Sequence, residues 1–354
     1  MHKKILITGV SGQDGSYMAE YCLELGHTVY GMIRRTSTPN YSNIKDILDN
    51  KSFKLVYGDL SDLSSIESIV KEIQPDYFIN FGAQSYVGAS WAMPEQTFDV
   101  TALGVLRCLE ALRKFAPNCR FYSAGSSEEM GDVEYSPQDI KHPIKPRSPY
   151  GAAKASARHI VKVYRESYNM FALHSILYNH ESERRGEEFV TRKITKGVAK
   201  IIKNIQDQKT FDPIELGNLE SRRDWSHAKD FVKGVWLMLN QPYPKEYVLS
   251  SGETHSIREF VNRAFSVAGI NETYWIGENE NETLVLPDYL ITEGNVKSKI
   301  LVKINSKFYR PAEVELLLGD SEEARKDLNW KPEINFERLV EKMVQHDLRE
   351  LKID

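Results

Sequence analysis

Tyr150 and Lys154 have the residue types and the spacing for proton transfer. They form a Tyr-x-x-x-Lys pair, and in a helix the i,i+4 spacing puts both side chains on one face. A tyrosine that takes a hydroxyl proton during hydride transfer needs its pKa lowered from about 10, and a nearby ammonium group lowers it. Because about one such pair is expected by chance in a chain rich in Tyr and Lys, the surrounding motifs must support this interpretation.

A second group of candidates lies in the segment 123–129, which follows a predicted strand. Ser126 could share a hydrogen bond with a substrate hydroxyl, and Glu128 could act as acid and base on neighbouring carbons. The alternative is structural: Ser126 or Ser127 caps the next turn, and Glu128 and Glu129 are the acidic residues of its first turn. The residues alone leave both interpretations open.

Three glycines predict a site for a nicotinamide dinucleotide. Gly9, Gly12 and Gly15 follow an apolar run in a G-x-x-G-x-x-G spacing, which permits a tight turn, close approach to a pyrophosphate and a helix start that favours the anion. No Gly-Lys-Ser/Thr follows, so the segment is not a P-loop. A plain strand-to-helix turn is the alternative.

The residues after the second predicted strand indicate which dinucleotide is bound. Arg34 and Arg35 stand where an acidic residue would bind a ribose 2′-hydroxyl. Guanidinium groups suit a 2′-phosphate, which favours NADP over NAD; the alternative is that both arginines are simply exposed to solvent. Asp59 is in position to receive an adenine amino group, or it is a helix N-cap.

The elements that must hold these residues alternate between strands and helices. Short apolar runs, among them ILITG, TVYGMI, YFINFGA and RFYSAGS, are followed by helical patterns at about 16–25, 64–73, 94–114 and 150–168. This alternation predicts an α/β fold, a Rossmann-type doubly wound parallel sheet with a smaller, partly interwoven lobe. We predict an NADP-binding domain at 1–180 and 224–251, and a nucleotide-sugar-binding lobe at 181–223 and 252–354.

Composition excludes several classes of protein. The chain has 354 residues, of which 41% are hydrophobic and 27% charged, and a formal net charge of −4, so a broad nucleic-acid or membrane footprint is not expected. No apolar run approaches the length of a membrane span. Three cysteines match neither a disulfide framework nor a zinc site, and the scattered histidines predict no catalytic metal. We expect a cytoplasmic enzyme.

Together these motifs resemble the extended short-chain dehydrogenase/reductase family and, within it, the GDP-mannose 4,6-dehydratases. The resemblance runs almost from end to end. Its most specific segments are 9–16, 34–37, 82–85, 179–186, 189–193, 223–230 and 309–314.

The resemblance implies a set of site residues. It gives the catalytic positions to Ser126, Glu128, Tyr150 and Lys154. The cofactor-binding residues are Gly9, Gly12, Gln13, Asp14, Gly15, Arg34, Arg35, Asp59, Leu60, Gly82, Ala83, Ser85, Tyr150, Lys154, His180 and Arg185. The substrate-binding residues are Ser85, Ser126, Glu128, Asn179, Val190, Lys193, Gly217, Arg223, Arg310 and Glu313.

Five positions depart from the pattern of the family. Ser126 replaces a threonine and keeps its hydroxyl, and Glu129 with Met130 replaces an apolar-aromatic pair. Glu183 replaces a proline, and Gln96 stands where a tyrosine beside the cofactor is expected. These changes bear on the fit of the substrate more than on the type of reaction.

The resemblance implies conversion of GDP-mannose to GDP-4-keto-6-deoxymannose and water through an internal NADP hydride cycle. Alternatives are the same dehydration of a related GDP-sugar such as a GDP-manno-heptose, a C4 oxidoreductase or epimerase of nucleotide sugars, and a non-catalytic NADP-sensing protein. The resemblance also implies a homodimer or homotetramer, in which the loop 35–43 could reach the cofactor of a neighbouring subunit.

Overall fold

The computed structural model describes residues 2–289, 298–309 and 316–353, and its largest element is a seven-stranded sheet. The strand order is β11-β6-β5-β4-β1-β2-β3, and every neighbouring pair is parallel. This confirms the predicted doubly wound α/β fold. The strands are β1 (Lys4–Thr8), β2 (Thr28–Ile33), β3 (Phe53–Tyr57), β4 (Tyr77–Asn80), β5 (Arg120–Ala124), β6 (Ala172–Leu177) and β11 (Val248–Leu249).

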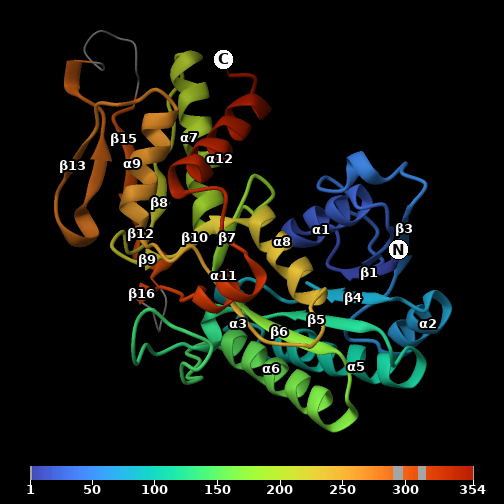
Figure 1. Cartoon of the computed structure of the whole chain (residues 1–354). Coiled ribbons are helices and arrows are strands. Elements are labelled where there is room, and N and C mark those ends of the chain that lie inside the picture. Colours follow the sequence, from blue (N-terminus) through green and yellow to red (C-terminus); the bar gives the residue numbers. More distant parts are fainter. Residues whose placement is uncertain (1, 290–297, 310–315, 354) are drawn as a thin grey trace. The chain divides into compact units, whose positions relative to one another are not determined.

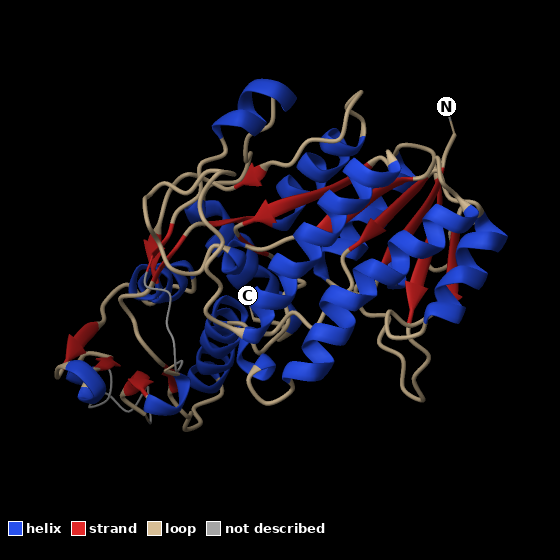
Figure 2. Ribbon diagram, turned by 90° about the horizontal axis from the view of Figure 1, so that it is seen from below, coloured by secondary structure: helices blue, strands red, loops and turns tan. Residues whose placement is uncertain are grey.

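Helices cover both faces of this sheet because its strands are apolar on both sides. Ile5 and Ile7 of β1 pack in a core with the side chains of α1 and α8, whereas Leu6 faces a second core with α2, α5 and α6. Figure 1 shows the two groups of helices on opposite faces, and Figure 2 shows the strands fanning between them. The helices are α1 (Gln13–Glu24), α2 (Leu63–Ile73), α5 (Gly104–Phe115), α6 (Pro149–Tyr168) and α8 (Ala228–Leu239).

The chain divides into two compact units, each with its own core. The first comprises residues 1–180, 226–252 and 317–333, and the second comprises 181–225, 253–316 and 334–354. The sequence boundaries assigned all of 252–354 to the sugar lobe, whereas 317–333 packs in the first unit. The reason lies in Trp330, which is buried in the core of the first unit and donates its indole N–H to the Asp230 carbonyl at 2.7 Å.

The second unit combines three long helices with a four-stranded sheet in the order β13-β14-β15-β8. Its largely aliphatic core contains an aromatic cluster, in which Trp225 stacks on Phe336 and meets Phe260 edge to face. The elements are α7 (Val190–Gln206), α9 (Ile257–Val267), α12 (Phe336–Glu350), β8 (Ile214–Leu216), β9 (Arg222–Arg223), β12 (His255–Ser256), β13 (Tyr274–Ile276), β14 (Thr283–Val285) and β15 (Ile300–Ile304).

Short elements complete the described chain. They are η1 (Lys45–Ile47), α3 (Val87–Ser90), α4 (Pro94–Phe98), the π-helical turn η2 (Asp99–Leu103), η3 (Ser127–Glu129), β7 (Asn179–Glu181), β10 (Trp225–His227), η4 (Asn279–Asn281), η5 (Ser306–Phe308), β16 (Leu316–Leu317) and α11 (Glu322–Leu328). Within the described ranges, no helix is both long and apolar enough to span a bilayer.

Candidate active site

The turn after β5 brings Ser126 and Glu128 together. Gly125 leads into Ser126, which is the N-cap of η3: its hydroxyl accepts a hydrogen bond from the Glu128 N–H at 3.2 Å. In return the Glu129 carboxylate accepts from the Ser126 N–H at 2.8 Å. The structure thus contains the capping box that the sequence offered as the structural alternative. In this arrangement the Ser126 oxygen acts as an acceptor, which leaves its own O–H as the group that could donate to a ligand.

Helix α6 presents Tyr150 and Lys154 at its start. Ser148 caps the helix by accepting from the Gly151 N–H at 3.0 Å, and Pro149 follows at the first helical position. Gly151 is required because a Cβ there would lie 2.4 Å from the Glu128 carbonyl oxygen. The turn that carries Glu128 therefore packs directly on the helix that carries Tyr150.

Lys154 links the helix to the end of β5. Its Nζ donates to the Ala124 carbonyl oxygen at 2.5 Å and lies 5.8 Å from the centroid of the Tyr150 ring. Both side chains are buried, with 6% and 8% of their surface exposed. Burial lowers the pKa of Lys154 to about 8, and the charges of Glu129 and Asp14 oppose that shift. A weakly held ammonium proton thus lies beside the tyrosine.

The glycine turn has the conformation that the spacing predicts. Gly9 has φ +65°, and its carbonyl accepts from the Gly12 N–H at 2.9 Å. A Cβ at Gly15 would lie 2.3 Å from the Gly9 carbonyl oxygen, so strand and helix could not approach so closely with any other residue. Gly12 is the N-cap of α1 and has no side chain to cap it, which suits an anion at this helix start.

A cavity of about 330 Å³ opens beside this turn. Several predicted cofactor residues line it, namely Gly9, Arg34, Asp59, Leu60, Gly82 and Ala83, and so does Gln96. Arg35 and Ser85 are exposed to solvent and do not line it. Of the two neighbouring arginines, only Arg34 therefore lines the cavity, a difference that the sequence alone does not indicate.

Asp59 is not the N-cap of the following helix, because Asp62 has that role. One Asp59 carboxylate oxygen instead accepts from the N–H and hydroxyl of Ser61, at 2.9 and 2.7 Å. Burial raises its pKa, but these bonds and the charges of Arg34 and Arg107 outweigh burial and lower it. The carboxylate is therefore ionised and ready to accept an N–H.

Asp14 and His180 connect the glycine turn to the end of β6. The His180 Nε2 lies 2.8 Å from Asp14 Oδ2, and the Gln13 amide donates to the His180 carbonyl at 3.0 Å. The imidazole ring stacks on Phe231 with 4.7 Å between centroids. Next to it, the Asn179 side-chain oxygen is buried and has no hydrogen-bond partner among the described residues, so it is available to a ligand.

The second unit holds the other predicted substrate residues. Lys193 lies on a cavity of about 430 Å³, which Lys196, Lys200, Phe211 and Phe308 also line. Its Nζ lies 3.2 Å from the centroid of the Phe308 ring, and burial lowers its pKa, although the charge of Glu215 opposes this. The cavity combines ammonium groups with aromatic rings, which suits an anionic ligand that carries a flat ring, although the carboxylates of Glu187, Asp212 and Glu215 also line it.

Other predicted residues of this unit lie apart from that cavity. Gly217 approaches Phe308, since a Cβ there would lie 2.7 Å from the Phe308 carbonyl oxygen. Arg223 is buried on β9 and donates to the Arg222 carbonyl at 2.9 Å, and Val190 is the first residue of α7. Arg310 and Glu313 lie outside the described residues.

Arg185, a predicted cofactor residue, belongs to the second unit as well. It pairs with Glu181 at 3.1 Å, and its guanidinium carbon lies 3.6 Å from the centroid of the Phe189 ring. Its side chain is only 18% exposed, so it does not lie on a solvated face.

Sequence reasoning missed the partner of Glu129. His174 of β6 places Nε2 at 2.9 Å from Glu129 Oε1, and both side chains are fully buried. The Ser-x-x-Glu spacing indicated the capping box, but no local pattern indicates a histidine 45 residues further along the chain.

Comparison with known proteins identifies the family. A sequence profile described as GDP-mannose 4,6 dehydratase matches residues 6–343. A GDP-mannose 4,6-dehydratase from Yersinia enterocolitica is 46% identical over 359 residues, which cover 99% of this chain and 95% of the relative. A human GDP-mannose 4,6 dehydratase is 44% identical and covers 97% of this chain and 91% of the relative.

Solved structures confirm the fold. A UDP-glucose 4-epimerase from Thermotoga maritima superposes with a TM-score of 0.78 at 19% identity, covering 99% of this chain and 100% of that one. A dTDP-glucose 4,6-dehydratase from Bacillus anthracis gives 0.76 at 19% identity, covering 99% and 98%. From the sequence match over nearly its whole length, the chain belongs to the GDP-mannose 4,6-dehydratase family.

Proposed function

We propose that this enzyme converts GDP-mannose into GDP-4-keto-6-deoxymannose and water, with NADP as a cofactor that is restored at the end of each cycle. The main support is that the turn with Glu128 packs on helix α6, where Gly151 permits the contact. This contact brings the backbone of Glu128, the residue with the candidate acid-base carboxyl group, onto the helix of the Tyr-Lys pair. A reaction that combines redox chemistry with loss of water needs both kinds of group close together.

The first unit fits a nicotinamide dinucleotide. Its glycine turn leaves the start of α1 open to a pyrophosphate, and the neighbouring cavity is lined by Arg34 and Asp59. Arg34 supports NADP, because its guanidinium group suits a 2′-phosphate. When bound there, the dinucleotide would supply a hydride acceptor for C4 of the sugar and, once reduced, a hydride donor for C6.

In the first half of the reaction, Tyr150 takes the proton of the C4 hydroxyl. The Lys154 ammonium favours the tyrosinate that this role needs, and its bond to Ala124 holds it at the end of β5. The Ser126 O–H donates to the C4 oxygen and keeps it in place. The product of this half is a 4-ketone.

In the second half, Glu128 acts as base and then as acid. The 4-ketone makes the C5 proton acidic, and Glu128 removes it; the protonated carboxyl group then gives that proton to the C6 hydroxyl, which leaves as water. Reduction at C6 and return of a proton to C5 complete the 4-keto-6-deoxy sugar. C4 is oxidised and C6 reduced, so the overall reaction loses one water and consumes no cofactor.

The second unit supports recognition of the GDP portion. The Lys193 cavity offers ammonium groups for a diphosphate and aromatic rings for a base. Arg223, Arg310 and Glu313 keep the substrate roles that family membership implies.

Glu128→Gln tests the proposal. The wild-type protein, incubated with GDP-mannose, is expected to give a product lighter by one water in mass spectrometry. The variant keeps the size of the side chain but cannot take the C5 proton, so we expect no deoxy product and an unchanged affinity for NADP. Deoxy product formed by the variant at the normal rate would show that Glu128 is not the base.

The same mass-spectrometric assay separates the competing activities. A C4 epimerase would release an isomer of unchanged mass and would need Tyr150 but not Glu128. A GDP-manno-heptose included beside GDP-mannose tests the alternative sugar, because it adds one hydroxymethyl group to the same reacting carbons.

We further propose that the enzyme works as a homodimer or homotetramer. Support comes from large apolar side chains that are exposed on helices of the first unit, with 40% of Phe98, 54% of Val163 and 52% of Tyr168 accessible. Light scattering of the purified protein measures the assembly directly, and a monomer at all concentrations would contradict it.

A further inference from the structure

Glu129 is a buried carboxylate that the proposed chemistry does not use. Its side chain is fully buried, and one oxygen, Oε1, accepts from both the Ser126 N–H at 2.8 Å and His174 Nε2 at 2.9 Å. The other oxygen has no hydrogen-bond partner among the described residues. Burying a carboxylate is costly unless it is paired. The two hydrogen bonds to Oε1 offset this cost, and they are formed only while the carboxylate stays in this position.

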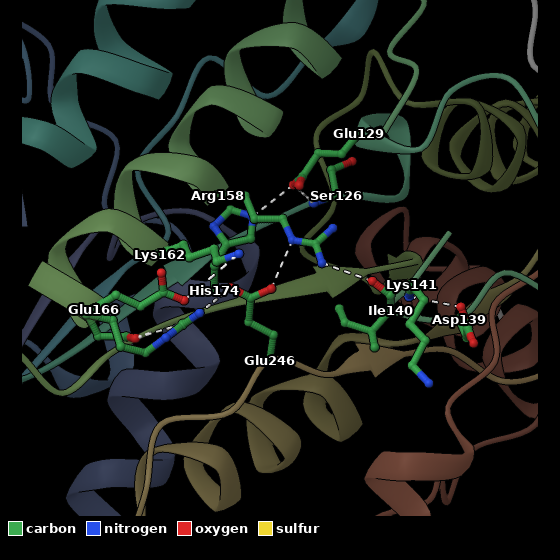
Figure 3. A network of polar contacts seen from close by, with 12 residues as sticks. Ser126, Glu129, Asp139, Ile140, Lys141, Arg158, Lys162, Glu166, His174 and Glu246 are labelled. Carbon is green, nitrogen blue, oxygen red and sulfur yellow. Dashed lines mark hydrogen bonds and ion pairs between the residues drawn. The ribbon is translucent and has the colours of Figure 1, made fainter. Parts of the chain in front are cut away.

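The surrounding backbone is shaped around this pair. A Cβ at Gly125 would lie 2.3 Å from His174 Nε2 and 2.7 Å from Glu129 Oε1. Only a glycine leaves room there for the carboxylate and the imidazole to meet. Figure 3 shows Ser126, Glu129 and His174 joined in this way, with the ring lying between the turn and Glu246.

Through the capping box, the position of Glu129 fixes the residues of the turn. Glu129 holds the Ser126 N–H, and the Ser126 hydroxyl in turn holds the Glu128 N–H at 3.2 Å. Losing the carboxylate would release the first of these bonds and leave a buried N–H without its acceptor. The turn would then be free to move both Ser126 and Glu128.

Glu246 is itself anchored, whereas the other ring nitrogen of His174, Nδ1, is buried and has no hydrogen-bond partner among the described residues. Glu246 accepts from Arg158 at 2.9 Å and from Arg165 at 3.0 Å, and both arginines belong to α6, the helix of Tyr150. The Arg158 guanidinium also donates to the Ile140 carbonyl at 3.0 Å. Among the hydrogen bonds of the described residues, the ring of His174 is therefore held through Nε2 and Glu129 alone.

We propose that Glu129, held by His174, is a positioning residue for the 4,6-dehydration: it locks the turn that aims Ser126 and Glu128 at the sugar. This inference rests on the proposed function. Because Glu129 does not touch the substrate in this role, its loss should lower kcat and leave the KM for GDP-mannose unchanged.

Two substitutions of Glu129 distinguish the effect of its hydrogen bonds on kcat from the effect of its side-chain volume. Glu129→Leu keeps a similar volume and removes both bonds, and we expect kcat to fall about 100-fold, the usual effect of a small misplacement of reacting groups. Glu129→Gln keeps an oxygen that accepts from both donors, so kcat should stay within about threefold of wild type. Glu166→Leu, an exposed glutamate of α6, is the matched control and should change nothing.

His174 provides a second, independent pair of variants in case Glu129→Leu fails to fold. His174→Leu removes the donor and should lower kcat as Glu129→Leu does, while His174→Gln retains an N–H and should restore most of the activity. For every variant, NADP affinity and circular dichroism confirm that the first unit is folded.

The possible results distinguish the positioning role of Glu129 from the proposed function of the enzyme. A folded Glu129→Leu or His174→Leu variant with wild-type kcat would overturn the positioning role and leave the proposed function intact. A KM that rises while kcat is unchanged would also overturn it, because the residue would then act on binding. Failure of the wild-type protein to remove water from GDP-mannose would instead remove the proposed function itself.

Discussion

Lys154 is a buried cation whose proton is held weakly. Burial lowers its pKa from 10.5 to about 8, against the opposing charges of Glu129 and Asp14. Within the described part of the chain its ammonium group donates one hydrogen bond, to the Ala124 carbonyl at 2.5 Å, and this neutral acceptor does not neutralise the charge. The group is therefore sensitive to pH in the range where such enzymes work.

We expect activity to fall as the pH rises through about 8, because the Tyr150 reaction needs the ammonium form of Lys154. Stability should change in the opposite sense. Between about 8 and 10.5 the unfolded chain binds more protons at this residue than the folded one, so its contribution to the free energy of unfolding increases with pH. If activity falls while the urea midpoint does not, the loss is due to titration of Lys154 and not to alkaline unfolding. A kcat/KM that stays constant across that pH range would contradict the prediction.

The two neighbouring arginines give a matched pair for testing the cofactor. Arg34 lines the cavity beside the glycine turn and Arg35 does not. Arg34→Gln should weaken NADP binding about 10- to 100-fold, the effect of one charge-assisted hydrogen bond, and leave NAD binding unchanged. Arg35→Gln should have a much smaller effect. Equal effects of the two variants in calorimetric titrations would mean that the 2′-phosphate is not bound at Arg34.

At the scale of elements, helix α6 is the part that must be placed correctly, because it carries Tyr150 and Lys154. Its start is set by Ser148 and Pro149, and its middle by the bond from Arg158 to Glu246. The predicted helix began at Tyr150. The cap explains the difference of one residue, since Pro149 suits the first position of a helix and Ser148 satisfies a free N–H.

Removing this cap should destabilise the first unit. Ser148→Ala removes the acceptor of the Gly151 N–H, and we expect a loss of about 1 kcal/mol in the free energy of unfolding. Ser156→Ala on the same helix is the control, because Ser156 only donates back to the Ala152 carbonyl and such a bond contributes little to helix stability. Urea denaturation of both variants measures the difference, and equal midpoints would show that the cap does not hold the helix start.

At the scale of the whole molecule, the sequence predicted what depends on local pattern and chain order. Strand–helix alternation gave the parallel sheet, and the glycine spacing gave the turn at Gly9. What it could not give were contacts between distant segments and departures from regular helix. His174 of β6 meets Glu129 in the turn after the neighbouring strand β5. The helix predicted at about 94–114 contains the π-helical turn Asp99–Leu103, for which a 3.6-residue periodicity gives no signal.

The return of residues 317–333 to the first unit was likewise beyond local pattern. Residues 317–333 follow a long stretch of the second unit, and their return to the first unit depends on Trp330 filling a space in a core formed elsewhere in the chain. The strands β13, β14 and β15 pair within a segment rich in Asn, Glu and Lys. Their pairing depends on neighbours rather than on their own composition.

Because the core of the second unit shares no residue with the cores of the first, damage to one unit can be confined to it. In the second unit, Arg192 of α7 and Asp347 of α12 form an ion pair in which the side chains are only 6% and 3% exposed. Asp347→Ala leaves the guanidinium group buried without its partner, which should cost about 3 to 5 kcal/mol. Asp207→Ala, which breaks exposed pairs with Lys203 and Lys209 at the end of α7, should cost at most about 1 kcal/mol.

Hydrogen exchange followed by mass spectrometry locates the damage. In Asp347→Ala we expect faster exchange in α7 and α12, and unchanged protection in β1, β4 and β5, whose cores contain no residue of those helices. Added NADP should slow exchange in the first unit of both the wild type and the variant, because a ligand stabilises the part of the chain that binds it. Loss of protection in β1, β4 and β5 equal to that in α7 would mean that the two cores unfold as one, and that the second unit cannot vary independently of the cofactor site.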